Sequence, residues 1–374
     1  MERCTGCILP VTTPGANFEN GLCTYCRNHC EVTYRGEQEL TAILDSHRAR
    51  GNRYDCIVGL SGGRDSTYTL LALVRDYGMR VLAVNYQNPL TDPQARKNIA
   101  NAVRILGVDL VEFGLPDRLH ERTFRDIATG WLRDPSPALV PMHCMSCKTF
   151  YRNVVQIAKR HNVGCIVNGG NRFEDVSFKK VLLGLTASVT AEQAITAAWL
   201  GLLKESWRHR SYFKPYMLPV LAMGYMFADP YTLGSRMLGR GIQRIDLFHF
   251  VTWHEETILA RIRSELGWDS PRGLKSTWRF DCRFGRLKDW MYTVTLGLTE
   301  RDDLYSNMVR NRALTRDEGL RRLEQEGAPD IEQVERLFEE FGVDPRLVAE
   351  VTSKAAHRFH AVPPSGPRTS RVEG

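Results

Sequence analysis

The chain has 374 residues, of which 43% are hydrophobic and 25% charged. This ordinary globular composition excludes a disordered chain, a collagen-like chain and a small disulfide-stapled scaffold. The net charge of +7 gathers mainly in residues 204–215 and 352–374, which excludes a dedicated nucleic-acid binder but allows a basic patch that faces an anionic substrate.

The N-terminus, Met1-Glu2-Arg3-Cys4, precedes no apolar run, so we expect no signal peptide. The most apolar stretches, 181–203 and 217–227, are interrupted by polar residues or by a proline, and we expect neither to span a membrane. The sequence therefore predicts a cytoplasmic protein, whose cysteines stay reduced and serve metals or chemistry.

Two Cys-x2-Cys pairs lie within the first 26 residues, and fifteen residues separate them. This spacing is typical of structural zinc sites, in which two tight knuckles supply four thiolates to one tetrahedral ion. We predict a zinc-knuckle segment over residues 1–35 with a role in folding. Its predicted ligands are Cys4, Cys7, Cys23 and Cys26.

A glycine-rich loop follows the strand pattern of residues 54–60 and precedes a helical pattern. Two glycines let the backbone approach an anion closely, and the helix N-terminus directs free N–H groups at it. An aspartate beside a phosphate is explained if Asp65 holds Mg2+ or caps the helix, and we expect it to be catalytic. The lysine of a Walker A loop is absent. The predicted phosphate-binding residues are Ser61, Gly62, Gly63, Asp65, Ser66 and Thr67.

Further strand patterns at 80–86, 108–113 and 163–168 alternate with helical patterns at 93–106 and 148–161. This alternation predicts an α/β fold with a doubly wound, mostly parallel sheet, in which ligands bind at the carboxyl ends of the strands. We assign this domain to residues 36–180.

A third Cys-x2-Cys pair, Cys144 and Cys147, precedes the helical pattern at 148–161. A helix N-terminus lowers the pKa of a thiol, which predicts a reactive setting. Three interpretations stay open: a redox-active or persulfide-carrying pair, half of a metal or iron–sulfur site completed by Cys282, and two ordinary thiols. Cys56 and Cys165 lie within strand patterns and are expected in the core.

The sequence Ser-Gly-Gly-x-Asp-Ser at residues 61–66 resembles the PP-loop of the N-type ATP pyrophosphatases. These enzymes bind ATP on a parallel sheet, adenylate a substrate oxygen, release pyrophosphate and let a nucleophile displace AMP. The resemblance implies that the adenine lies at the end of the second strand, and that the loop after strand 163–168 closes over the phosphates, unless that loop is a simple turn. The residues implied are Val84, Asn85 and Tyr86 for the first contact, and Gly169 and Gly170 for the second.

Over about residues 1–350 the chain resembles the N-acetyl sugar amidotransferases of surface-polysaccharide (lipopolysaccharide) synthesis. The shared features are the two N-terminal cysteine pairs, the lead Tyr54-Asp55-Cys56 into the loop, and the late segment 303–318. The resemblance implies that ATP and Mg2+ activate an acetamido oxygen of a nucleotide sugar, which ammonia-derived nitrogen then replaces. It also implies a separate glutaminase and an ammonia-channelling subunit as partners.

The pair Cys144 and Cys147 departs from that family and resembles the tRNA 2-thiolation PP-loop enzymes. In those enzymes a pair and one later cysteine can hold an iron–sulfur cluster, which implies a 4Fe-4S site at Cys144, Cys147 and Cys282. An ATP-dependent sulfur transferase acting on tRNA or a small molecule is therefore the alternative, with both cysteines of the pair as catalytic candidates. We place amidotransfer first because that resemblance covers nearly the whole chain.

Three segments complete the predicted organisation. Residues 181–300 form an aromatic and basic insert, which is either a solvated face or a contact for the substrate diphosphate or for RNA. Residues 301–357 follow a helical pattern and are assigned to packing or subunit contact. Residues 358–374, rich in proline, are predicted to be disordered.

Overall fold

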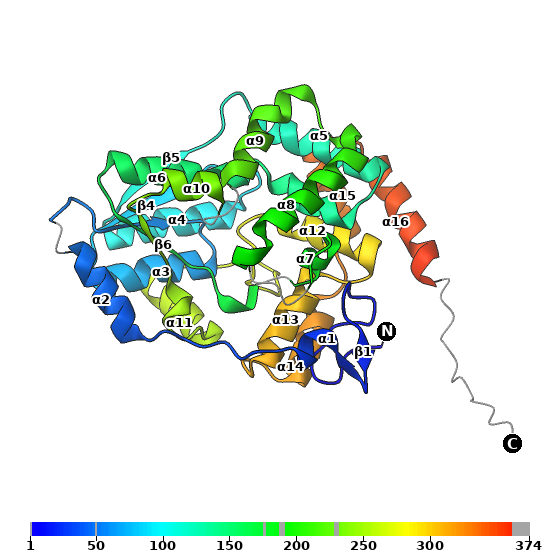
Figure 1. Cartoon of the computed structure of the whole chain (residues 1–374), viewed down its shortest axis with the longest axis horizontal. Coiled ribbons are helices and arrows are strands. Elements are labelled where there is room, and N and C mark those ends of the chain that lie inside the picture. The colour runs from blue at the N-terminus through cyan, green and yellow to red at the C-terminus, as the bar shows by residue number, and fades with distance from the viewer. Residues whose placement is uncertain (1, 49–50, 175–176, 187–190, 228–231, 361–374) are drawn as a thin grey trace, which may run out of the picture.

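A five-stranded parallel sheet lies at the centre of the molecule, in the order β5-β4-β3-β6-β7 (Figure 1). The computed structural model describes residues 2–48, 51–174, 177–186, 191–227 and 232–360. Every neighbouring pair of strands in this sheet is parallel. The predicted α/β class is therefore confirmed. The strands are β3 (Cys56–Gly59), β4 (Val81–Tyr86), β5 (Asp109–Phe113), β6 (Cys165–Asn168) and β7 (Gln243–Asp246).

Helices cover both faces of the sheet, as a doubly wound fold requires. Alternate strand residues point to opposite faces, so that Val58 and Ala83 pack with one set of helices, while Ile57 and Leu82 pack with another. The first face carries α2 (Glu37–Arg48), α3 (Arg64–Arg75), α4 (Pro93–Leu106) and α11 (Glu255–Leu266), and the second carries α6 (Phe150–Arg160). Burial of both faces explains the nearly continuous apolar sequence of β3 and β4.

A helical body packs beside the sheet and has its own aromatic core (Figure 1). Trp131, Trp290 and Phe338 are fully buried there. The body is built mainly from α5 (Leu119–Arg133), α12 (Phe284–Leu296), α15 (Ile331–Glu340) and α16 (Pro345–His360). The predicted C-terminal helical region is thus confirmed. The predicted disordered tail lies mostly outside the described residues, and α16 continues to His360.

The predicted insert contributes to the sheet as well as to the surface. Residues 181–300 contain the end of α7 (Ser177–Leu182), all of α8 (Ala191–Arg208), α9 (Leu218–Phe227) and α10 (Leu233–Leu238), and also the edge strand β7. The sheet therefore extends past the boundary predicted at residue 180. Within the described residues, no helix is both long enough and apolar enough to cross a membrane.

The N-terminal segment folds into a small hairpin that packs on the C-terminal helices. It consists of β1 (Phe18–Glu19), β2 (Leu22–Cys23) and the single-turn α1 (Thr24–Arg27). Arg3 pairs with Asp302 at 2.7 Å, and the Ile8 N–H donates to the Ser306 hydroxyl at 3.3 Å. Both partners belong to α13 (Glu300–Arg310), which is followed by α14 (Arg316–Glu326).

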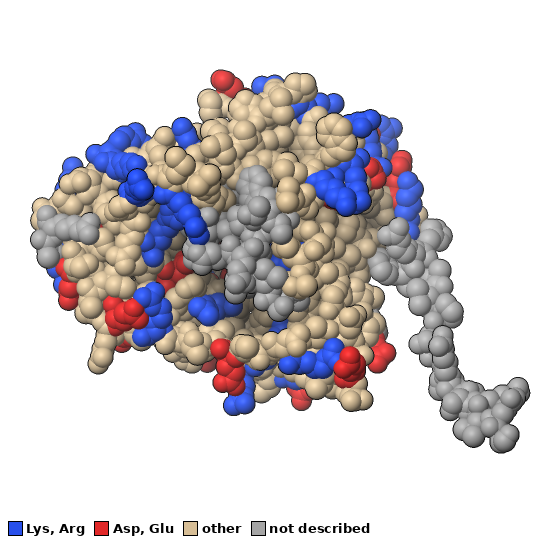
Figure 2. Space-filling view, in the orientation of Figure 1, with Lys and Arg blue, Asp and Glu red and all other residues tan. Residues whose placement is uncertain are grey.

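Basic side chains form separate groups on the face seen in Figure 2. Lysines and arginines gather over α6 and α10, and others lie within a hollow near the centre. In the predicted basic patch at 204–215, Arg208 pairs with Glu205 at 3.1 Å and His209 with Asp134 at 2.6 Å. Part of that patch is therefore neutralised within the chain.

Candidate active site

The glycine-rich loop joins the end of β3 to the start of α3, at the carboxyl edge of the sheet. Gly62 has a φ of +81°, and a Cβ atom there would lie 2.2 Å from the carbonyl oxygen of Ala95. Only glycine fits this position, because α4 crosses directly behind the loop. The Ser66 hydroxyl accepts from the Ser61 N–H at 3.2 Å and lies 3.0 Å from the Ser61 hydroxyl. The loop is thus held in a tight curve at the N-terminus of α3.

A cavity of about 330 Å³ opens on this loop. Five of the predicted binding residues line it: Ser61, Gly63, Asp65, Ser66 and Gly169. Thr67 is fully buried behind the loop, and neither Gly62 nor Gly170 lines the cavity. Val84, Asn85 and Tyr86 are buried at the end of β4 and do not line it either. The adenine contact predicted there stays a prediction.

Asp65 accepts hydrogen bonds from three different elements. Its carboxylate takes the Arg64 Nε–H at 2.9 Å, the Trp253 indole N–H at 3.0 Å and the Asn171 amide at 3.0 Å. The N-cap of α3 is Gly63, and no side chain caps this helix. The capping alternative for Asp65 is therefore wrong. A magnesium-binding role for Asp65 stays a prediction. The Asp65 carboxylate lines the cavity, which is the position that this role requires.

Three cations converge on one buried carboxylate beside the loop. Glu300, the first residue of α13, pairs with Lys179, with Arg279 at 3.0 Å and with Lys288 at 3.0 Å. Burial alone would raise the pKa of Glu300, but the three cations hold it well below its usual range. Arg279 also pairs with Glu174 at 3.1 Å. Arg279 and Lys288 line the cavity, so two of these cations face the loop.

Sequence reasoning missed this cation cluster. Its members come from α7, from the loop before α12, from α12 and from α13, and no spacing links them. Arg279 and Asp281 lie close to Cys282 in the sequence, and this proximity to a candidate residue is the one signal that the sequence offers. Both residues line the cavity, and burial raises the pKa of Asp281.

Two of the three later cysteines, Cys144 and Cys282, line the same cavity as the loop. Cys147 lies behind them, with its sulfur 3.9 Å from His120 Nε2, while His120 Nδ1 lies 3.0 Å from the Tyr86 hydroxyl. Burial raises the pKa of the Cys147 thiol well above its usual value. The prediction that the N-terminus of the following helix lowers this pKa is wrong for Cys147, because loss of solvent outweighs the helix dipole. A cluster at Cys144, Cys147 and Cys282 stays a prediction.

Cys56 and Cys165 are fully buried within β3 and β6. Their predicted place in the core is confirmed. Asp175, which follows Glu174 in the sequence, lies outside the described residues.

The four N-terminal thiols form the one group found among the described residues that could hold a metal ion. All four sulfur atoms lie within 4.8 Å of one another. The Cys4–Cys26 and Cys7–Cys23 sulfur separations are both 3.7 Å. A zinc ion with bonds of about 2.3 Å requires an edge of about 3.8 Å in its sulfur tetrahedron, so the thiols fit zinc.

Donors around these thiols suit the thiolate form. The Cys23 N–H donates to the Cys4 sulfur at 3.2 Å, and Arg310 donates to the Cys7 sulfur at 3.4 Å. Hydrogen bonds from surrounding groups orient metal ligands and stabilise their charge. Arg310 is the last residue of α13, so this helix contacts the thiol group at one end and the cation cluster at the other.

Comparison with known proteins gives one sequence match and several matches of fold. No family model matches the chain. A segment of 105 residues, 28% of this chain, is 33% identical to a glutamine-hydrolysing GMP synthase of Pyrobaculum aerophilum. That match covers 20% of the synthase, so the chain spans about a fifth of the length of this relative.

Three solved structures align with this chain at low identity and low TM-score. An NH3-dependent NAD synthetase from Campylobacter jejuni aligns at 12% identity and a TM-score of 0.28, over 51% of this chain and 92% of its own. An NMN synthetase from Francisella tularensis aligns at 13% identity and a TM-score of 0.28, over 62% of this chain and 91% of its own. A tRNA thiolase from Methanococcus maripaludis, solved with a 4Fe-4S cluster, aligns at 14% identity and a TM-score of 0.33, over 84% of this chain and 86% of its own. The glycine-rich loop and the parallel sheet that presents it are similar to those of the PP-loop ATP pyrophosphatases, and 105 residues of the chain are similar to a GMP synthase.

Proposed function

We propose that this protein is an AMP-forming amidotransferase that replaces the acetamido oxygen of a nucleotide sugar with ammonia-derived nitrogen. The observation that carries the proposal is one cavity in which the Ser61–Ser66 loop meets the cations Arg279 and Lys288. Such a cavity suits a triphosphate whose terminal phosphates depart as pyrophosphate. The acetamido acceptor rests on the sequence resemblance over residues 1–350.

The chemistry needs activation because an amide oxygen is a poor leaving group. The oxygen attacks the α-phosphorus of ATP, and the bond to the β-phosphate oxygen breaks to release pyrophosphate. Ammonia then attacks the activated carbon, the carbon–oxygen bond breaks, and AMP leaves with that oxygen. The acceptor gains an acetamidino group. The protein's contribution is positioning and electrostatic stabilisation of the phosphate charge.

Each part of the cavity has a role in this scheme. The free N–H groups at the start of α3 and the hydroxyls of Ser61 and Ser66 bind the phosphates. Lys288 and Arg279 take up the charge of the departing pyrophosphate. Asp65 would hold Mg2+, which binds through one or two carboxylates together with substrate phosphates and neutralises their charge. Asn171, Trp253 and Arg64 orient the Asp65 carboxylate for that role.

The ammonia is expected from a separate glutaminase through a channelling subunit. The sequence given contains no Gly-x-Cys-x-Gly nucleophile elbow. The GMP synthase that matches part of this chain is itself glutamine-hydrolysing by name, which is consistent with a nitrogen source outside the shared segment. We propose zinc as the ion held by the four N-terminal thiols.

Sulfur transfer is the second candidate, and one observation favours it. The thiols of Cys144 and Cys282 line the cavity that holds the phosphate loop, where a sulfur carried by the protein would reach an activated carbon. In this scheme sulfur, not ammonia, displaces AMP. Cys144, Cys147 and Cys282 would then serve as carriers or as ligands of a 4Fe-4S cluster.

The experiment that separates the two is an assay of AMP release from ATP with UDP-N-acetyl sugars, with either ammonia or sulfide as nucleophile. Amidotransfer predicts AMP and pyrophosphate that depend on ammonia and on the sugar, and product that gains nitrogen by mass spectrometry. AMP formation that depends on sulfide alone would reverse the ranking. Formation of ADP and phosphate would overturn both proposals.

A further inference from the structure

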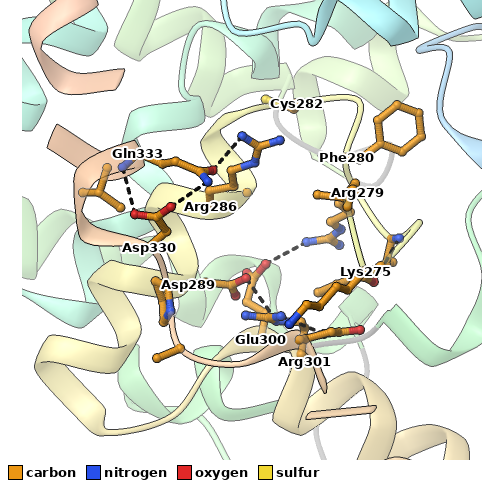
Figure 3. Close-up of a pocket in the computed structure, with 18 of the residues that line it drawn as sticks. Lys275, Arg279, Phe280, Cys282, Arg286, Asp289, Glu300, Arg301, Asp330 and Gln333 are labelled. Carbon is orange, nitrogen blue, oxygen red and sulfur yellow. Dashed lines mark hydrogen bonds and ion pairs between the residues drawn. The ribbon is translucent and has the colours of Figure 1, made fainter. Parts of the chain in front are cut away.

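A second cavity, of about 230 Å³, adjoins the phosphate-loop cavity (Figure 3). The two cavities share the lining residues Trp278, Arg279, Cys282 and Gly285. The segment between β7 and α12 therefore forms a common wall. The two cavities thus meet at Arg279 and Cys282, which line both.

Most of the acidic side chains in this second cavity are already paired. Arg301 binds Asp289 at 3.2 Å and Glu326 at 2.7 Å, and Figure 3 shows Arg301 beside Asp289. Glu300 is held by the three cations described above. Arg301 thus balances one of its two carboxylates, and Asp330, the remaining acid of this cavity, accepts from the Gln333 side-chain amide at 2.7 Å.

Two cations of the same cavity lack a close acidic partner. Lys275 is exposed, and none of the ion pairs found among the described residues involves it. Arg286 donates to the Gln333 side chain at 3.1 Å, and its ion pair in the described part of the chain, with Asp92, is long at 3.9 Å. Both side chains are therefore available to an anion.

A third cavity, of about 370 Å³, continues the groove on the other side of Arg286. It shares Gly273, Leu274, Arg286 and Gln333 with the second cavity and adds Arg272. Arg272 is exposed, and the described residues give it no acidic partner. Arg283, in contrast, is neutralised by Glu340 at 2.5 and 2.9 Å. A groove with three available cations thus leads to the phosphate loop.

We infer that this groove binds the phosphates of the acceptor, with Arg272, Lys275 and Arg286 as its ligands. Guanidinium groups form paired hydrogen bonds with phosphate oxygens, and an ammonium adds a point charge. A diphosphate held there leaves the other end of the acceptor free to enter the junction at Arg279 and Cys282, where ATP meets it. This inference rests on the proposed function for the identity of the acceptor.

A small phosphorylated molecule fits the groove better than RNA does. RNA backbones are bound along extended basic surfaces, whereas the available cations here line adjoining cavities of a few hundred Å³. We therefore assign the groove to a diphosphate-bearing small acceptor, and we treat RNA as a competing outcome of the test.

The test uses UDP and UDP-N-acetylglucosamine as probes on the full-length protein, with the ATP site filled by α,β-methylene-ATP. We expect calorimetry to show UDP binding in the presence of the analogue, weaker at high salt. Arg286→Ala and Lys275→Ala should each weaken UDP binding by roughly tenfold to a hundredfold, and Arg286→Lys by less. Binding of the analogue should change less than about twofold. Arg346→Ala, an exposed arginine far from the groove in sequence, is the matched control.

Two results would overturn the inference. UDP binding that disappears when the analogue is present would show that UDP had occupied the phosphate loop. A single-stranded RNA that binds more tightly than UDP, and that loses affinity in the same variants, would assign the groove to RNA. If the proposed function fails but this inference holds, the result is different: no AMP forms, and UDP still binds in the groove.

Discussion

Glu300 lies 3.0 Å from Lys288, and this ion pair joins the first turn of α13 to a lysine that faces the phosphate loop. The opposite end of α13 carries Arg310, which donates to the Cys7 sulfur at 3.4 Å. One helix therefore spans the distance between the N-terminal thiol group and the catalytic cavity. We expect a substitution at the thiol group to affect the cation cluster at Glu300, and a substitution at the cluster to affect the thiol group.

Lys288→Ala should lower the rate of AMP formation by roughly tenfold to a hundredfold, because it removes a cation that faces the departing pyrophosphate. The fold should persist, since Glu300 keeps Lys179 and Arg279 as partners. Steady-state kinetics would check this, with a larger effect on kcat than on the KM for ATP. Lys159→Ala, which removes an exposed lysine at the end of α6, is the control and should leave both constants unchanged.

ATP binding should weaken as the pH rises through about 8. Burial lowers the pKa of Lys179 to about 8 from its ordinary 10.5, so this lysine is charged below that pH and loses its proton above it. The cluster around Glu300 then has one positive charge fewer to offer to phosphates. We expect a three- to tenfold rise in the Kd for α,β-methylene-ATP between pH 7 and 9, an order-of-magnitude figure for one charge pair. In Lys179→Met that rise in Kd should be absent. If the variant shows the same rise as the wild-type protein, Lys179 has no part in the pH dependence of ATP binding.

Asp65→Ala should abolish AMP formation, with a loss of at least about a hundredfold. It should also lower the free energy of unfolding by about 1–3 kcal/mol, because Trp253 and Asn171 lose their acceptor. Asp65→Asn keeps the shape and part of the hydrogen bonding, so it should be folded and inactive. Thermal unfolding together with the AMP assay checks both statements, and an active Asp65→Ala protein would refute the loop assignment.

Cys4→Ser should reduce bound zinc and destabilise the protein, since the four thiols form one closed site. Because α13 links this site to Glu300, AMP formation should fall as well. Metal analysis, thermal unfolding and the AMP assay would be compared with Cys30→Ser, which changes an exposed cysteine. A zinc-free Cys4→Ser protein with unchanged stability would contradict the structural role.

Cys144→Ser and Cys282→Ser distinguish nitrogen transfer from sulfur transfer. If ammonia is the nucleophile, AMP formation should fall by less than about tenfold, because neither thiol then takes part in bond making. Metal and sulfide analysis of anaerobically purified protein provides the second readout. One zinc without labile sulfide fits amidotransfer, whereas iron, labile sulfide and loss of activity in both variants would make sulfur transfer the function.

The sequence predicted the parts of the fold that depend on local patterns. The strands that became β3, β4, β5 and β6 are marked by apolar runs between turn residues, and each was found within a few residues of its predicted bounds. Strand β7 was not predicted, because Gln243-Arg244-Ile245-Asp246 holds one apolar residue at a sheet edge. Its pairing with β6 depends on tertiary contact, which no local pattern carries.

The site divides in the same way. The loop glycines and serines were found because an anion-binding turn needs them at adjacent positions. Lys179, Lys288 and Glu300 lie on three different helices, and they form a recognisable charge cluster only when the fold brings them together. For Cys147 a local pattern was misleading. Its place before a helix predicted a low thiol pKa, but its burial raises that pKa.

The most direct test of the whole account is the fate of α-labelled ATP in the presence of a UDP-N-acetyl sugar and ammonia. An AMP-forming pyrophosphatase of the proposed kind gives labelled AMP and an equal amount of pyrophosphate, and this reaction stops in Asp65→Ala. Labelled ADP from the wild-type protein, or labelled AMP that persists in Asp65→Ala, would contradict the account.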